Sequence, residues 1–303
     1  MSELRFNELR GEQVVYAIHR QDRTFLPQRE SCPLCPTRPG GPPTEIPLPT
    51  FEIAVFENRF PAFEAPRGAA EVVVYTDDHD ASFGSLSAQR AEDLMWVWRH
   101  RYRELGARQD VAYVFIFENR GVEVGVTLHH PHGQIYAFPF LPPVPALEIA
   151  ADERLGACAL CALMSEELRD GQRIVDQNDA VLSYVPYAAR WPYEVHVALR
   201  EHRPSLLECE PAELQLLAAA LQRLARGYDA LFARPFPYMM VVHQAPTDGA
   251  ARGHLHVELY TPLRTASKLK YLAGSEQGAG TFICDTLPEE SAAALREAIA
   301  RAG

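Results

Sequence analysis

The sequence predicts an α+β fold built from two similar halves, each an antiparallel sheet with one long helix. Two observations carry this prediction. Two Cys-x-x-Cys pairs, at 32–35 and 158–161, are each followed by the same order of candidate strands and one candidate helix. Histidines recur behind each pair at nearly equal distances, so we expect halves at 1–143 and 144–303. The aligned histidines are His79 with His202, and His130 with His254.

The first half is expected to hold four strands and one helix. The helix prediction rests on apolar side chains three or four residues apart, including Leu94, Trp98 and Leu105. The last strand of this half contains His130 and His132. In chain order, the predicted elements are strands at 51–58 and 72–75, a helix at 87–105, and strands at 111–118 and 124–138.

The second half repeats this order. Its long helix begins with a proline, which is favoured in the first turn because the N–H it lacks has no partner there. A C-terminal helix should follow, with Thr286 and Glu289 forming a capping box at its start. The other predicted elements are strands at 180–186 and 193–199, the helix at 211–232, and strands at 238–244 and 255–260.

Composition limits the function. The chain has 303 residues, 47% hydrophobic and 23% charged, which is typical of a globular protein. Its formal net charge of −11 argues against duplex DNA as a partner, because binding phosphates needs a basic surface. A few arginines can still bind a small anionic substrate. No segment resembles a signal peptide or a membrane span, so we expect a cytoplasmic protein whose six cysteines are thiols or metal ligands.

Cysteine spacing predicts metal centres. A Cys-x-x-Cys pair is either redox-active or half of a zinc site, and the βαβ context of the redox motif is missing here. Each half adds two histidines to its pair, which completes the Cys₂His₂ set of a closed structural zinc site. The alternative is coincidence, with histidines that are simply part of the core. We predict two zinc ions per chain, one held by Cys32, Cys35, His79 and His130, the other by Cys158, Cys161, His202 and His254.

A second histidine follows two residues after the last ligand of each half. Residues two apart in a strand share a face, so we expect His132 to be presented by the strand that His130 anchors. The halves then differ, because the first has Gln134 where the second has Glu258. A glutamine amide can donate a hydrogen bond to a phosphoryl oxygen, whereas a carboxylate would repel it. We therefore place catalysis in the first half, and scaffolding or metal binding in the second.

The segment His130-Pro131-His132-Gly133-Gln134-Ile135 resembles the active-site signature of galactose-1-phosphate uridylyltransferases, the transferase branch of the histidine triad superfamily. The resemblance covers about residues 8–285. It implies two fused histidine-triad-like halves and a homodimer. The other matching stretches lie at 19–23, 56–60, 117–121, 185–192, 243–246 and 268–274.

The resemblance also implies a reaction. Such enzymes move a uridylyl group from UDP-glucose to galactose 1-phosphate by a ping-pong route through a covalent uridylyl-histidine. His132 matches the nucleophile, and Gln134 matches the residue that hydrogen-bonds the transferring phosphoryl group. Thr127 stands where the family usually has serine and keeps the hydroxyl, while Gly125 permits close approach of the backbone to phosphate.

Further substrate contacts follow from the same resemblance. Asn58 and Asn119 match nucleotide-binding residues, and Arg59 replaces an acidic residue often found at its position. The remaining matches are Arg20 and Arg23, which reach sugar phosphates and in the family often act from the partner subunit, and Lys270 and Glu276, which fall in the hexose-binding region.

Two questions stay open at this level. The best-known members build their second metal site from a glutamate and three histidines, which here match Glu148, His243, His256 and Glu258. We favour the second Cys₂His₂ tetrad and keep this set as the lesser option. The sequence fixes neither the base nor the hexose. The rivals are a related phosphorylase or adenylyltransferase acting on ADP-glucose, and a non-catalytic, zinc-stabilised nucleotide-binding protein.

Overall fold

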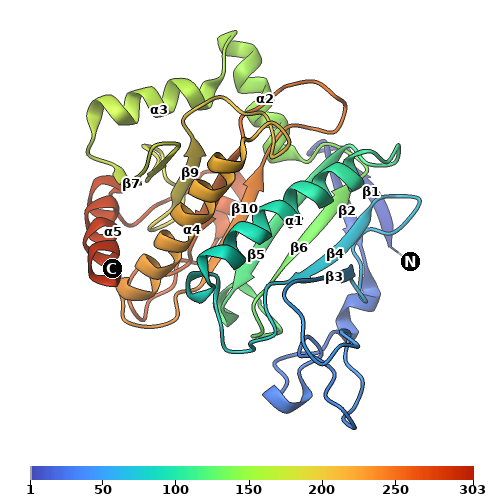
Figure 1. Cartoon of the computed structure of the whole chain (residues 1–303). Coiled ribbons are helices and arrows are strands. Elements are labelled where there is room, and N and C mark those ends of the chain that lie inside the picture. The colour runs from blue at the N-terminus through green and yellow to red at the C-terminus, as the bar shows by residue number, and fades with distance from the viewer. Residues whose placement is uncertain (1) are drawn as a thin grey trace.

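The computed structural model describes residues 2–303 and confirms the α+β class. Nine strands form one continuous antiparallel sheet in the order β3-β4-β6-β5-β10-β11-β9-β8-β7, and a separate hairpin, β1-β2, lies near the N-terminus (Figure 1). The strands are β1 (Glu3–Asn7), β2 (Glu12–Tyr16), β3 (Ala54–Glu57), β4 (Ala69–Val74), β5 (Tyr113–Arg120), β6 (His132–Phe138), β7 (Ile174–Gln177), β8 (Val181–Tyr184), β9 (Val195–Leu199), β10 (Tyr238–His243) and β11 (His256–Tyr260).

The two halves meet in the middle of this sheet. β5 of the first half pairs with β10 of the second, so the two expected sheets are one. Outward from this seam, the first half runs β5-β6-β4-β3 and the second runs β10-β11-β9-β8. The halves thus repeat their strand order on either side of the seam.

Two long helices cover one face of the sheet side by side (Figure 1). Helix α1 (Ala88–Gly106) starts at Ser87, whose side chain accepts a hydrogen bond from the Arg90 backbone N–H at 3.1 Å. Helix α4 (Pro211–Leu231) begins with proline, as predicted. Their apolar faces bury Trp98 of α1 and Leu221 of α4 in the main core.

The remaining helices belong to the second half. They are α2 (Pro143–Leu155), α3 (Ala159–Asp170) and α5 (Pro288–Ala302). The sequence did not reveal α2 and α3. The predicted capping box of α5 is wrong, because Leu287 is the N-cap and Glu289 instead accepts a hydrogen bond from Arg173 at 2.9 Å. None of the helices in residues 2–303 is long and apolar enough to cross a membrane.

The strand predicted at 124–138 is shorter than expected. Residues 122–124 form a 3₁₀ turn between two glycines with positive φ, Gly121 and Gly125. An extended loop follows, and β6 begins only at His132. His130 therefore precedes the strand, as His254 precedes β11.

Candidate active site and metal centres

The first-half signature lies on β6. His132 and Gln134 are half-buried on one face, whereas Gly133 and Ile135 are buried on the other. Ile135 belongs to the core that α1 covers, so the two polar side chains point away from the helices. His132 and Gln134 line one cavity together with Asn58 and Thr127.

His132 is held in one orientation by the main chain. Its Nδ1 lies 2.8 Å from the carbonyl oxygen of His130. A carbonyl only accepts, so Nδ1 carries the proton and Nε2 keeps the lone pair of a nucleophile. Burial lowers the pKa of His132 below its usual value, which favours the neutral imidazole that such a nucleophile needs.

Gln134 is fixed through its amide oxygen. Oε1 accepts a hydrogen bond from Asn58 Nδ2 at 3.2 Å and from the Tyr136 hydroxyl at 3.3 Å. Arg20 donates in turn to Tyr136 at 3.0 Å. This chain of donors assigns the oxygen of Gln134 to the protein, so its NH₂ group is left to donate to a ligand.

The other predicted nucleotide-binding residues surround these two. Arg23 borders the same cavity, and Asn119 lines a second cavity that His132 also borders. Gly125 has a φ of +80°, which favours glycine, and open space surrounds the position that a Cβ would take. Arg23 thus reaches the cavity at His132 from its own chain, whereas Arg20 contacts Tyr136 and does not line that cavity.

Lys270 and Glu276 lie elsewhere. They form a buried ion pair at 3.1 Å, with Nζ also contacting the Ile283 carbonyl. Neither residue lines the two cavities at His132. Within one chain, the structure therefore does not bring the predicted hexose-binding pair to the cavities at His132.

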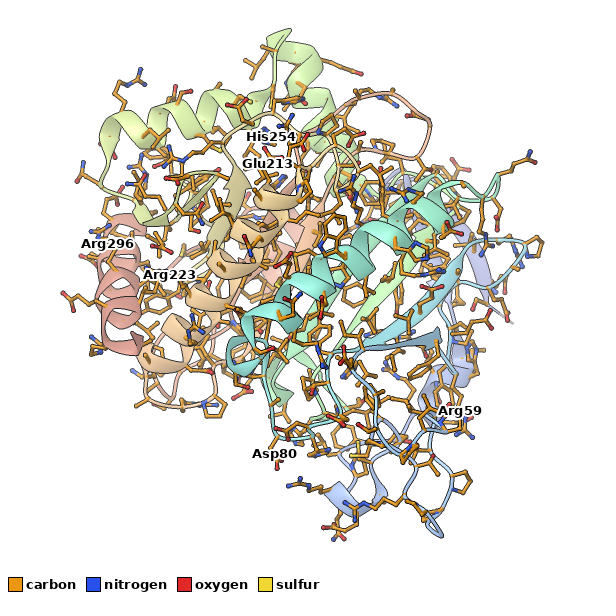
Figure 2. All side chains as sticks on the ribbon, viewed as in Figure 1. Arg59, Asp80, Glu213, Arg223, His254 and Arg296 are labelled. Carbon is orange, nitrogen blue, oxygen red and sulfur yellow. The ribbon has the colours of Figure 1, made fainter. Side chains whose placement is uncertain are left out.

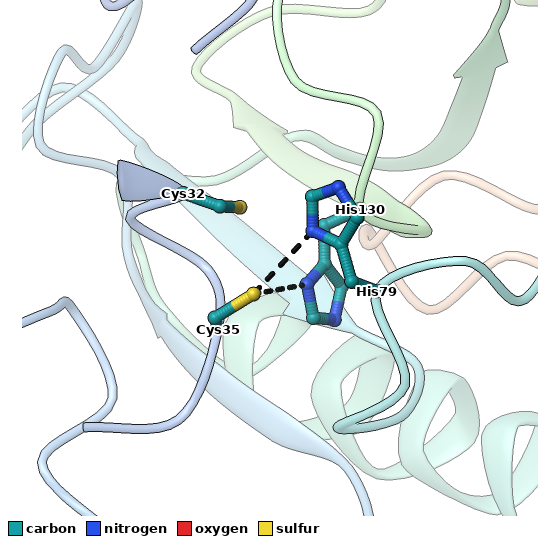
Figure 3. A group of neighbouring side chains, drawn as sticks. All are labelled: Cys32, Cys35, His79 and His130. Carbon is teal, nitrogen blue, oxygen red and sulfur yellow. Dashed lines mark hydrogen bonds between the residues drawn. The ribbon is translucent and has the colours of Figure 1, made fainter. Parts of the chain in front are cut away.

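The first Cys₂His₂ set forms a cluster (Figure 3). The Cys35 sulfur lies 3.4 Å from His79 Nδ1 and 3.5 Å from His130 Nδ1. His130 Nε2 lies 2.7 Å from the carbonyl of Thr76, which makes it the donor and turns the Nδ1 lone pair toward the sulfurs. The same His130 supplies the carbonyl that holds His132, so this cluster directly fixes the position of the His132 ring.

The second Cys₂His₂ set forms an equivalent cluster. His254 Nδ1 lies 3.4 Å from the Cys161 sulfur and 3.6 Å from that of Cys158, and His254 Nε2 lies 2.9 Å from the Leu199 carbonyl. Figure 2 shows His254 well away from Asp80, which neighbours the first cluster. In each set all four ligand atoms lie within 4.8 Å of one another, and thiol sulfurs with imidazole nitrogens suit zinc.

The alternative metal-binding set is also brought together in the structure. Glu148, His243, His256 and Glu258 bring their ligand atoms equally close, with His243 Nδ1 2.7 Å from Glu148. The two alternatives for a second site are thus not exclusive. Sequence reasoning missed His196, whose Nε2 lies 3.1 Å from Glu258. The spacing of His196 two residues after Glu194, within a predicted strand, is the sequence feature that could have indicated this contact site.

Comparison with known proteins points to one family. The sequence profile "Galactose-1-phosphate uridyl transferase, N-terminal domain" matches residues 63–142, and the profile of the C-terminal domain matches 150–301. The galactose-1-phosphate uridylyltransferase of Thermotoga maritima is 39% identical over 98% of both chains. That of Haemophilus influenzae is 32% identical over 96% of this chain and 93% of its own.

Solved structures give the same picture. A uridylyltransferase structure superposes with a TM-score of 0.88, at 32% identity over 99% of both chains. An ADP-glucose phosphorylase from Arabidopsis thaliana superposes with a TM-score of 0.76, over 98% of both chains. At 21% identity, this second likeness concerns the fold alone.

Proposed function

The chain belongs to the galactose-1-phosphate uridylyltransferase family, and we propose that His132 is the covalent nucleophile of its reaction. Full-length relatives identify it as a UDP-glucose–hexose-1-phosphate uridylyltransferase of galactose metabolism. The observation that carries the proposal is the hydrogen bond from His132 Nδ1 to the His130 carbonyl, because it leaves Nε2 as the unprotonated nitrogen of a residue that lines the cavity.

The reaction has two displacements at one phosphorus. In the first, His132 Nε2 forms a bond to the α-phosphorus of UDP-glucose while the bond to the glucose 1-phosphate oxygen breaks. In the second, a phosphate oxygen of galactose 1-phosphate attacks the same phosphorus, the N–P bond breaks and UDP-galactose leaves. Sugar phosphates depart without a strong general acid, so the protein's task is positioning and charge stabilisation.

Individual residues divide this task. The His130 carbonyl accepts the hydrogen bond from Nδ1–H throughout and offsets the positive charge that develops on the uridylylated ring. The NH₂ group of Gln134 donates to a non-bridging phosphoryl oxygen, and the Thr127 hydroxyl and Gly125 backbone offer further contacts. Asn58 and Asn119 bind the nucleotide, and Arg20 and Arg23 bind sugar-phosphate charge.

We propose zinc in both Cys₂His₂ clusters. Four protein ligands leave no open coordination position, so the metal stabilises structure and takes no part in the displacements. Glu148, His243, His256 and Glu258 remain the lesser option, since a mixed imidazole and carboxylate set suits zinc or iron. We also propose that residues 1–143 form the catalytic half and residues 144–303 the scaffolding half.

We further propose a homodimer in the cytoplasm. The buried Lys270–Glu276 pair does not line the cavities at His132 within one chain, and a second copy can bring its equivalent loop to the site. The sheet face that carries Gln134 also presents half-buried aromatic rings, such as Phe117 and Tyr136, 4.9 Å apart. Sedimentation of the purified protein tests this, with a dimer expected and a monomer at micromolar concentration contradicting it.

Turnover and labelling test the function. With UDP-glucose and galactose 1-phosphate we expect UDP-galactose, parallel double-reciprocal plots, and uridylylated protein when the acceptor is withheld. His132→Ala should lose turnover on the order of 10³-fold or more, the scale of removing a covalent nucleophile. His100→Ala, which removes an exposed histidine of α1, is the matched control. Preference for ADP-glucose would favour the rival phosphorylase, and binding without a covalent adduct would favour the non-catalytic protein.

A further inference from the structure

One group of buried polar side chains lies directly behind the catalytic strand. Glu118 on β5 is opposite Gly133 in the sheet register, and it points to the face covered by helices, where only 3% of it is exposed. The Tyr238 hydroxyl donates to Glu118 Oε1 at 3.1 Å. Buried carboxyls are rare and need a reason, and the substrate contacts described above make no use of this one.

Tyr75 occupies the space under the signature glycine. It follows β4 and is completely buried. A Cβ on residue 133 would overlap the Tyr75 hydroxyl oxygen, which explains why the residue between His132 and Gln134 is a glycine. The Tyr75 backbone N–H also donates to the Pro131 carbonyl at 3.2 Å. Tyr75 therefore contacts the chain on both sides of His132.

Tyr75 and Glu118 are neighbours with unused hydrogen-bonding capacity. The Tyr75 hydroxyl lies beneath Gly133, and Glu118 is paired with Gly133 across the two strands, so both side chains lie beside the same residue. Yet the Tyr75 hydroxyl and Glu118 Oε2 are both buried without a hydrogen-bond partner of normal geometry among residues 2–303. Burial raises the pKa of Glu118 to about 7, although the charge of Arg120 opposes this. Either group can complete a pair between them, because the Tyr75 hydroxyl can donate to the Oε2 of a carboxylate and a protonated carboxyl can donate to the Tyr75 oxygen.

We propose that Tyr75, Glu118 and Tyr238 form a positioning network that holds the backbone of 131–134 from behind, so that His132 Nε2 and the Gln134 amide meet the phosphoryl group in register. None of the three lines the cavity that holds Asn58, Thr127 and Gln134. This inference rests on the proposed role of His132 as nucleophile. Because a displacement of about 1 Å at a reacting group can cost about 10²-fold in rate, loosening this backbone should slow uridylylation.

The test is single-turnover uridylylation of the whole protein by UDP-glucose, followed by intact mass and peptide mapping. Tyr75→Phe and Glu118→Leu should slow labelling by roughly 10- to 100-fold. The UDP-glucose concentration that gives half-maximal rate should change less than about threefold, because neither Tyr75 nor Glu118 lines the cavity formed by Asn58, Thr127 and Gln134. Glu118→Gln should stay within about threefold of wild type, since its amide still accepts from Tyr238 and donates to Tyr75.

Tyr184→Phe is the matched control. Tyr184 is also a buried tyrosine whose hydroxyl has no partner within residues 2–303, and it lies on β8 of the other half, so its loss should leave the labelling rate unchanged. A purely structural role for the network predicts lower melting temperatures with a normal rate in the folded fraction. A label on His132 that forms at wild-type rate in Tyr75→Phe and Glu118→Leu overturns the network alone.

Two further outcomes complete the test. Gly133→Ala should be slow because its methyl group meets the Tyr75 hydroxyl, and adding Tyr75→Phe should speed it, the opposite of what the second change does by itself. A double variant slower than Gly133→Ala contradicts the network. A label that maps to a residue other than His132 overturns the proposed nucleophile and this inference with it.

Discussion

The segments 130–134 and 254–258 share one arrangement and carry different chemistry. In each, the second histidine donates from Nδ1 to the carbonyl of the first, at 2.8 Å for His132 and 2.7 Å for His256. In each, the first histidine donates from Nε2 to a backbone carbonyl and turns Nδ1 toward a cysteine pair. The repeat therefore extends from the sequence to the hydrogen bonds of the two sites.

The difference lies two residues further on. Gln134 is neutral, and burial lowers the pKa of His132. Burial also acts to lower the pKa of His256, but the hydrogen bond to Glu258 and the charge of Glu148 outweigh it and raise that pKa to about 9. The surroundings of His256 therefore favour its protonated ring, whereas those of His132 favour the neutral ring. The neutral or charged side chain at this one position is thus the main chemical difference between the two segments.

Breaking the two cysteine pairs should give the largest effects. Structural zinc contributes on the order of 10 kcal/mol to a small module, and part of that is redundant in a large core. Wild type should contain close to two zinc ions per subunit. We expect Cys158→Ser/Cys161→Ser to hold one zinc and melt at lower temperature, while its folded fraction keeps a near-normal KM. Cys32→Ser/Cys35→Ser should also lose turnover, because His130 no longer holds His132.

Metal analysis, melting curves and initial rates measure these effects. One zinc per subunit in both the wild type and Cys158→Ser/Cys161→Ser would contradict the proposal of a second Cys₂His₂ zinc site. So would iron bound at Glu148 and His243 while Cys158 and Cys161 are freely alkylated.

Exchanging the neutral and charged side chains at positions 134 and 258 should give the second-largest effects. Gln134→Glu places a carboxylate beside the phosphoryl oxygens, and we expect kcat to fall at least about 10²-fold, the scale of losing one oxyanion donor, without unfolding. The mirror change, Glu258→Gln, should leave kcat of the folded protein near normal. Steady-state kinetics with melting curves decide this, and near-wild-type turnover of Gln134→Glu would show that Gln134 does not touch the reacting phosphate.

The two long helices, α1 and α4, differ in how their N-termini are capped, and we expect smaller effects on stability there. α1 is capped by the neutral Ser87, whereas α4 uses Glu213, which accepts from the Glu210 N–H at 2.7 Å and from Arg203. Burial raises the pKa of Glu213, but the hydrogen bonds from Arg203 and Glu210 prevail, so its net shift is downward. Its stabilisation is therefore complete above the ordinary carboxyl pKa and is lost as pH falls through the lowered value.

We expect Glu213→Gln and Ser87→Ala each to lose about 1 kcal/mol of unfolding free energy at pH 7. Only the difference between wild type and Glu213→Gln should shrink toward pH 3. Urea unfolding at several pH values measures both, and equal pH dependence of the two variants would contradict this reading of the α4 cap.

Much of the site could be predicted because its chemistry is carried by rare residues. Cysteines and histidines are few, so their recurrence at similar spacings pointed to both tetrads, and the structure assembles both sets. The α+β class followed from the same repeat. The merging of the halves into one sheet could not be predicted, because nothing in the sequences of β5 and β10 marks them as partners rather than edges.

Other features depend on residues that are distant in the chain. The sequence contains Glu118 within a family-like stretch, but its neighbours Tyr75 and Tyr238 come from separate strands. The reason for Gly133 likewise appears only when the Tyr75 hydroxyl is seen beneath it. His196 escaped notice because its partner Glu258 lies on another strand.

The most direct test of the central claim is to locate the uridylyl group after brief exposure of the protein to UDP-glucose without acceptor. Peptide mapping should find it on His132 and not on His256, although both rings make the same hydrogen bond to the backbone. His256→Ala should label to the same extent per folded molecule, and His132→Ala should not label. A uridylyl group on His256, or full labelling of His132→Ala, would contradict the assignment of catalysis to the first half.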